Sequence, residues 1–105
     1  MNNHELVFLS ATSLASEIRN KQISPVEAVE AYLQQINRID PKLNAYITVL
    51  ADQALEAARE SESDVTSGIN RGPLHGVPVA VKDQIYTKGI RTSSASKIRS
   101  DFVPD

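Results

Sequence analysis

The sequence predicts an α/β chain with about three helices followed by one or two strands of a mixed sheet. A segment near residues 24–40 has helix-capping residues and apolar side chains at helical spacing. Residues 77–81 are all apolar, which is typical of a short strand buried on both faces. The charge balance changes between them, because residues 1–71 carry 6 basic and 10 acidic side chains and residues 72–105 carry 5 and 3. We therefore predict a helical region at 1–71 and the start of an α/β core at 72–105.

Length and composition limit the classes of protein to consider. A chain of 105 residues has room for one domain at most, and its 41% apolar and 23% charged residues are near the averages of globular proteins. Because cysteine is absent, disulfides, Cys-ligated metals and a thiol nucleophile are excluded. With only two histidines, we expect no metal and no cofactor. The net charge of -2 argues against direct nucleic-acid binding, which normally needs a basic surplus.

The sequence also bears on where the protein resides. No run of about 18 apolar residues is present, so we expect no membrane-spanning segment. The first residues do not match a secretory signal, because acidic Glu5 and no basic residue precedes the short apolar run at 6–9. We expect a cytoplasmic protein.

The second predicted helix has the strongest local pattern. Ser24 as the N-cap, Pro25 at the first helical position and Glu27 three residues after the cap form a capping box. We expect this helix to end at Asp40–Pro41, because a proline disfavours helical backbone at the residue before it. Its apolar side chains recur at intervals of three and four and should be buried; they are Val26, Val29, Leu33, Ile36 and Ile39.

The first and third predicted helices are shorter. The first runs from about Thr12 to Lys21, with Ser10 or Thr12 as its N-cap. The third covers residues 51–60, where the composition is helical but the alanine-rich apolar face is shallow. Residues 61–72 are polar and turn-prone, so we predict a loop there.

Extended backbone is predicted in two places. Val77–Val81 should be a buried strand, with Pro78 at its start or on an unpaired side because proline cannot donate a ladder hydrogen bond. The run at 45–50 is too short for periodicity to separate strand from helix, although its β-branched residues favour an extended conformation. A turn is predicted at Lys88-Gly89.

Lys82 is the first candidate catalytic residue, because it directly follows the predicted strand. Ligand sites of open α/β sheets gather at the carboxyl ends of strands. A lysine that is partly withdrawn from water holds its proton less tightly and can then act as a base near neutral pH. The alternative, which position and spacing alone favour, is a solvated strand-end charge paired with a carboxylate.

Hydroxyl side chains form the second candidate feature, and they are Thr92, Ser93, Ser94 and Ser96. A serine becomes a nucleophile only when a base lies within hydrogen-bond reach, and a Ser-Lys pair is one way to supply that base. The alternative, a polar turn or helix cap, is the commoner role of such clusters. His75 could also be a base, but a histidine in a turn before a strand more often holds the backbone by hydrogen bonding.

Two stretches in the second half of the chain, Gly72–Asp83 (GPLHGVPVAVKD) and Thr87–Ser96 (TKGIRTSSAS), closely resemble the early part of the amidase signature family. The resemblance covers nearly the whole chain, from about Leu9 to Asp105. Three earlier stretches look like the N-terminal helices of that family: Ser24–Glu27, Tyr32–Leu33 and Asp40–Tyr46.

The resemblance implies the N-terminal portion of the amidase signature fold and an amide hydrolase with a Ser-cisSer-Lys triad, in which Lys82 is the catalytic lysine. In that family both triad serines lie beyond the stretch matched here, so Ser93, Ser94 and Ser96 match neither of them. The resemblance therefore implies a single incomplete domain that is inactive alone. The parent enzyme would act on a small-molecule amide.

Two alternatives stay open. Within the family, the chain could belong to the glutaminase component of a tRNA-dependent amidotransferase, which releases ammonia from glutamine for a partner subunit. Outside the enzymes, it could be a non-catalytic helical interaction module. In every case, absent sheet partners should leave apolar faces exposed, and the chain could self-associate through them.

Overall fold

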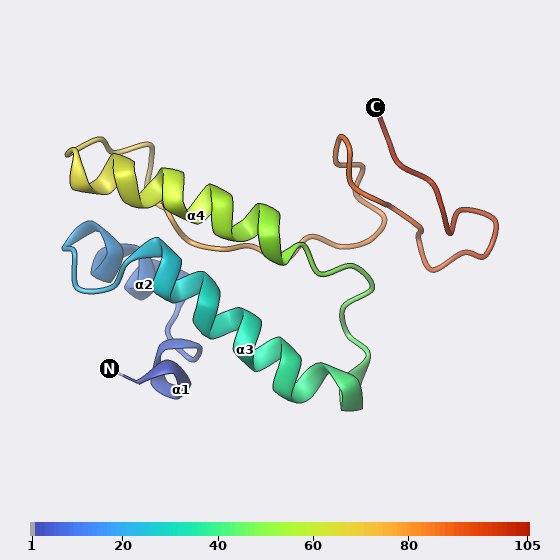
Figure 1. Ribbon diagram of the computed structural model, residues 1–105, viewed down its shortest axis with the longest axis horizontal. Helices are drawn as coiled ribbons and strands as arrows, with labels where there is room; N and C mark the ends of the chain where they lie inside the picture. The colour runs from blue at the N-terminus through green and yellow to red at the C-terminus, as the bar shows by residue number, and fades with distance from the viewer. Residues whose placement is uncertain (1) are drawn as a thin grey trace. The chain divides into compact units, whose positions relative to one another are not determined.

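The computed structural model describes residues 2–105, in which four helices lie in the first two thirds of the chain (Figure 1). They are α1 (Asn3–Leu6), α2 (Ala11–Arg19), α3 (Pro25–Leu43) and α4 (Ala51–Thr66). The chain forms two compact units. Unit 1 comprises residues 2–45 and Leu50–Pro78, and unit 2 comprises Tyr46–Val49 and Val79–Asp105. No helix in residues 2–105 is long and apolar enough to cross a membrane.

The N-caps of α1 and α2 set where the first helices begin. Asn2 forms a capping box with Glu5, because the Asn2 side chain accepts from the Glu5 amide and the Glu5 carboxylate accepts from the Asn2 amide. Ser10 Oγ accepts from Ser13 N at 3.1 Å, which confirms Ser10 as the N-cap of the first predicted helix. That helix is α2, and it ends at Arg19, two residues earlier than predicted.

The start of α3 is confirmed, but its predicted end is wrong. Ser24 Oγ accepts from Glu27 N at 3.0 Å, and Pro25 occupies the first helical position. The helix continues past Asp40–Pro41 to Leu43 and ends at Asn44, which has φ 53°. Asp40 makes this extension favourable, because its carbonyl accepts from Asn44 N and its carboxylate accepts from Ala45 N, both at 2.7 Å.

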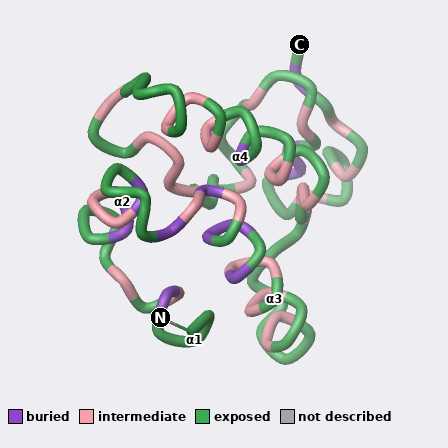
Figure 2. The backbone as a smooth tube through the Cα atoms, turned by 60° about the vertical axis from the view of Figure 1, so that its left-hand side comes forward, coloured by how far each residue is buried: buried purple, intermediate pink, exposed green. Residues whose placement is uncertain are grey.

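Unit 1 has an apolar core between its helices. The longest helices, α3 and α4, lie side by side, and α1 also packs against α3 (Figure 1). Of the predicted apolar stripe on α3, Val29 is buried and the other four residues are half-buried. Figure 2 shows the buried positions gathered in α1, α2 and the first turns of α3. The buried apolar residues are Leu6, Leu14, Ala15, Ile18, Ile23, Ala28, Val29, Ala31 and Ala58.

Helix α4 is longer than predicted. The predicted helix at 51–60 is present, but residues 61–66, predicted as a loop, continue it to Thr66. Val65 packs against the core cluster, and Asp64 pairs with Arg71, their Oδ2 and Nε atoms lying 2.5 Å apart. These two contacts stabilise the last turn of the helix, which its polar composition alone did not indicate.

The predicted strands are absent from residues 2–105, so the predicted α/β fold class is wrong for this chain. Residues 77–81 are irregular, and Val79 and Val81 are 84% and 54% exposed. A strand needs a neighbouring strand to pair its N–H and C=O groups, and no described residue provides one. The run at 45–50 is likewise an irregular link between α3 and α4.

Candidate functional site

Lys82 lies in unit 2 with its side chain exposed to solvent. Its carbonyl oxygen accepts from Ile85 N at 3.0 Å, so a turn rather than a strand follows it. The predicted placement at a sheet edge therefore has no counterpart in residues 2–105. What holds the main chain here is the next residue, Asp83.

Asp83 binds the loop that carries the hydroxyl residues. Its carboxylate accepts from the amide and from the hydroxyl of Ser93, with the amide at 2.9 Å, and from Ala95 N at 3.2 Å. Its main-chain carbonyl accepts from Ser94 N at 2.9 Å. Ser94 and Ala95 have positive φ values of 51° and 57°, which turn the loop so that three consecutive residues donate to Asp83.

The hydrogen bond from the Ser93 hydroxyl lowers the pKa of Asp83 below its usual value of 3.8, and the amides of Ser93 and Ala95 act in the same direction. The positive charge of Arg91 adds to this effect, while desolvation opposes it. The carboxylate is therefore ionised at neutral pH.

Ser93 occupies its hydroxyl in this contact. It is 3% exposed, and its Oγ donates to Asp83 and accepts from Ala95 N at 3.3 Å. A hydroxyl has a single proton to donate, so Ser93 cannot donate to an amine while it is bound to Asp83. This arrangement matches the predicted polar turn and not a local Ser-Lys pair.

The other hydroxyl residues also serve the loop or solvent. Thr92 is buried, its Oγ1 donates to Ile90 O at 3.1 Å, and its amide donates to Phe102 O at 2.9 Å. Ser96 Oγ accepts from Ile98 N at 3.2 Å. Ser94 is exposed. The predicted turn at Lys88-Gly89 is confirmed, with Gly89 at φ 75°.

His75 lies in unit 1 and holds the backbone, as predicted. Its Nδ1 accepts from Arg71 N at 3.4 Å, and its side chain is only 10% exposed. Because Nδ1 accepts a proton, the neutral ring carries its own proton on Nε2, which lies 3.6 Å from Asp64 Oδ2. His75 therefore links the loop after α4 to the end of that helix.

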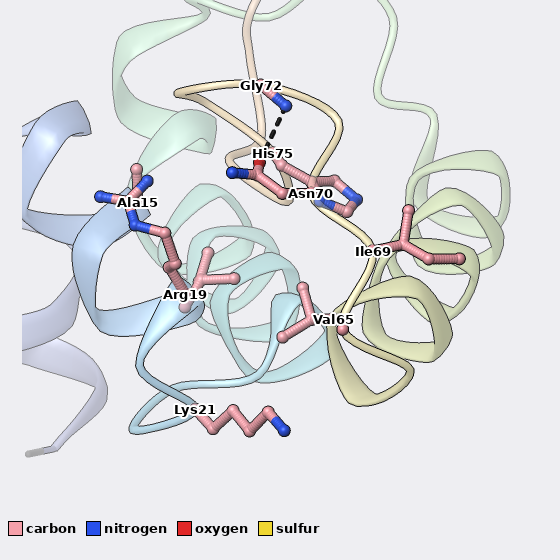
Figure 3. Close-up of a pocket in the computed structure, with 10 residues that line it drawn as sticks. Ala15, Arg19, Lys21, Val65, Ile69, Asn70, Gly72 and His75 are labelled. Atoms are coloured by element: carbon pink, nitrogen blue, oxygen red, sulfur yellow. Dashed lines mark hydrogen bonds between the residues drawn. The ribbon is translucent and has the colours of Figure 1, made fainter.

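A cavity of about 140 Å³ lies within unit 1, and no sequence pattern indicated it (Figure 3). Much of its wall is aliphatic, and the basic side chains of Arg19 and Lys21 point away from each other in Figure 3. The polar contact drawn there joins Gly72 N to Asn70 Oδ1 at 3.0 Å within the loop itself. The lining residues are Ala15, Ile18, Arg19, Lys21, Val65, Gly68, Ile69, Asn70, Gly72 and His75.

Metal-ligand geometry is also absent from the part of the chain that the structure describes. No group of three or more His, Asp or Glu side chains there is placed to hold a metal ion. The chemistry available in unit 2 is therefore that of one exposed amine beside a fixed, ionised carboxylate.

Comparison with known proteins places these features in a family context. A family model described as Amidase matches residues 27–105, which include Lys82 and the loop bound by Asp83. The curated relatives are single subunits of glutamyl-tRNA(Gln) amidotransferases. The one from Carboxydothermus hydrogenoformans is 43% identical over 100 residues, which cover 95% of this chain and 21% of the relative. The corresponding protein of Geobacter metallireducens is 47% identical over 100 residues, again 95% of this chain and 20% of the relative. The chain thus spans about a fifth of the length of these curated relatives.

Proposed function

The chain belongs to the amidase family, and we propose on that premise that it supplies the lysine of an amide-hydrolysing active site, with Lys82 as that lysine. The observation that carries the proposal is the position of Lys82 inside the matched stretch, next to an aspartate that accepts four hydrogen bonds from one loop. The serine beside it is occupied by Asp83, which supports a source of nucleophilic hydroxyls outside these 105 residues.

In the proposed reaction Lys82 is the proton acceptor. Its neutral amine takes a proton, through a bridging serine, from a nucleophilic serine whose oxygen bonds to the amide carbonyl carbon. The same path returns the proton to the departing nitrogen as the C–N bond breaks, and water then releases the acyl group. Lys82 is exposed here, so the proposal requires other residues to cover it, because a solvated amine remains protonated near pH 7.

The substrate class follows from the relatives. Their name describes one component of an amidotransferase for glutamyl-tRNA(Gln). We therefore expect the side-chain amide of glutamine to be the bond that is hydrolysed, with partner subunits using the ammonia. A general amidase of the same family is the second candidate, and it differs only in the amide that is bound.

The test is a graft in which this chain replaces the corresponding residues of the Geobacter metallireducens relative. We expect the graft to hydrolyse glutamine, and the 105-residue chain alone to give no ammonia from glutamine or simple amides. With the relative's partner subunits, the graft should also amidate glutamyl-tRNA(Gln).

Two outcomes would reject the proposal. Turnover by the 105-residue chain alone would mean that its own hydroxyls suffice. A folded but inactive graft, together with a concentration-independent oligomer of the chain by light scattering, would instead favour the non-catalytic interaction module.

A further inference from the structure

We propose that Asp83 is a positioning residue that fixes the main chain at Lys82 and so limits where the lysine amine can reach; this inference rests on the proposed role of Lys82. Asp83 touches none of the reacting groups in that proposal. It acts through the main chain of the residue before it.

The hydrogen bonds of Asp83 make it the centre of its loop. Both carboxylate oxygens and the main-chain carbonyl accept from the three consecutive residues 93–95. Ser93 is buried although Val81, Lys82 and Ser94 around this contact are exposed. An anchor that uses side chain and main chain together holds the position and the orientation of residue 83.

The anchor extends to Lys82 through the peptide carbonyls. Lys82 O accepts from Ile85 N, and Asp83 O accepts from Ser94 N, so the carbonyls on both sides of Asp83 are hydrogen-bonded. The main chain is therefore held at the point from which the lysine side chain leaves, while that side chain remains exposed to solvent.

A carboxylate suits this position better than an amide. Three donors converge on its two oxygens, and both oxygens of an ionised carboxylate accept. An asparagine would present an N–H₂ group in place of one oxygen and would lose at least one acceptor. Arg91 is the charged group whose field acts on Asp83, and its guanidinium donates to Ser100 O, so it also belongs to this loop.

A fixed base for a long side chain has a kinetic consequence. Lysine has a long, flexible stem between its main chain and its amine, so movement of the main chain adds directly to the volume that the amine samples. Loss of the anchor should slow proton transfer while leaving the binding of the amide nearly unchanged.

The first test uses the 105-residue chain itself, by ¹⁵N relaxation at the Lys82 amide. We expect an order parameter of about 0.85 in the wild type and below about 0.6 in Asp83→Asn. Asp101→Asn is the matched control, since Asp101 is an exposed aspartate of the same unit, and it should match the wild type. A wild-type value below about 0.6, or a value near 0.85 that survives Asp83→Asn, would overturn the inference.

The second test uses the graft and separates positioning from a merely structural role. We expect Asp83→Asn to lower kcat about 10-fold with KM within about twofold, and Asp101→Asn to change neither. An unchanged kcat would reject positioning even if Lys82 loses order. The two proposals fail differently, because an inactive graft with native Lys82 and Asp83 rejects the function, whereas the order parameter of the chain alone is independent of activity.

Discussion

Side chains withdrawn from water in unit 1 are mostly aliphatic, whereas those in unit 2 are Thr92, Ser93 and Pro104. Unit 2 leaves large apolar residues in solvent, with Val79 84% and Ile98 96% exposed. Unit 1 is therefore stabilised by burial of apolar surface, and unit 2 by hydrogen bonds that converge on one carboxylate. The segment that carries the candidate lysine depends on a few polar contacts that can each be removed by one substitution.

The largest effect is expected in the core of unit 1. Ile18→Ala removes a side chain that is 1% exposed, so we expect a loss of about 3 kcal/mol in the free energy of unfolding. Urea denaturation followed by the helical circular dichroism signal measures it. Phe8→Ala is the control, because Phe8 is 73% exposed and its removal should change little. Equal effects of the two substitutions would contradict an aliphatic core centred on α2.

A glycine next to that core should give the second largest effect. Gly76 has φ +85°, and a Cβ there would lie 3.0 Å from Pro25 Cγ and 3.1 Å from Ile18 Cγ2. We expect Gly76→Ala to destabilise the chain by about 2 kcal/mol, from backbone strain and overpacking together. Gly68→Ala is the control, since Gly68 has φ +80° with no atom within 4 Å of such a Cβ. A smaller effect at Gly76 than at Gly68 in thermal unfolding would show that the close approach is not present.

The N-cap of α3 sharpens the comparison at a smaller scale. Ser24→Ala removes the acceptor for Glu27 N and should cost about 1 kcal/mol, measured by urea denaturation. Ser61→Ala within α4 should be close to neutral. The order parameter of Lys82 should not change in either variant, because Ser24 belongs to unit 1.

The smallest effect concerns the carboxylate of unit 1. The hydrogen bond from Arg71 lowers the pKa of Asp64 from its usual 3.8, and the charges of Arg71 and His75 act in the same direction. This contact therefore stabilises the folded state above pH 3.8 and is lost as pH falls through the lowered pKa. We expect Arg71→Ala to return the pKa of Asp64 toward 3.8 in a ¹³C titration, and Arg59→Ala not to. An unmoved Asp64 in Arg71→Ala would show that the pair does not form.

Local patterns predicted the helical parts well, because the interactions that begin a helix lie within a few residues of one another. Ser10 and Ser24 are N-caps as predicted, and His75 holds the backbone. The end of α3 and the last turns of α4 were missed, since they depend on the carboxylates of Asp40 and Asp64 binding groups outside the local pattern.

The features of unit 2 could not be predicted from the sequence in the same way. An apolar run such as 77–81 indicates a strand only if a partner strand is present, and residues 2–105 contain none. The contact between Asp83 and Ser93 spans ten residues and needs positive φ at Ser94 and Ala95, which neither residue type favours. The position of Lys82 was identified through family resemblance and not through spacing.

Hydrolysis of glutamine by the graft with Lys82→Ala, compared with Lys88→Ala, tests the central claim most directly. Both are exposed lysines of unit 2, and Lys82 alone follows the apolar run that resembles the family. The account predicts that Lys82→Ala lowers kcat/KM at least about 100-fold, the scale of a lost proton acceptor, and that Lys88→Ala stays within about twofold. Equal activity of the two variants would contradict it.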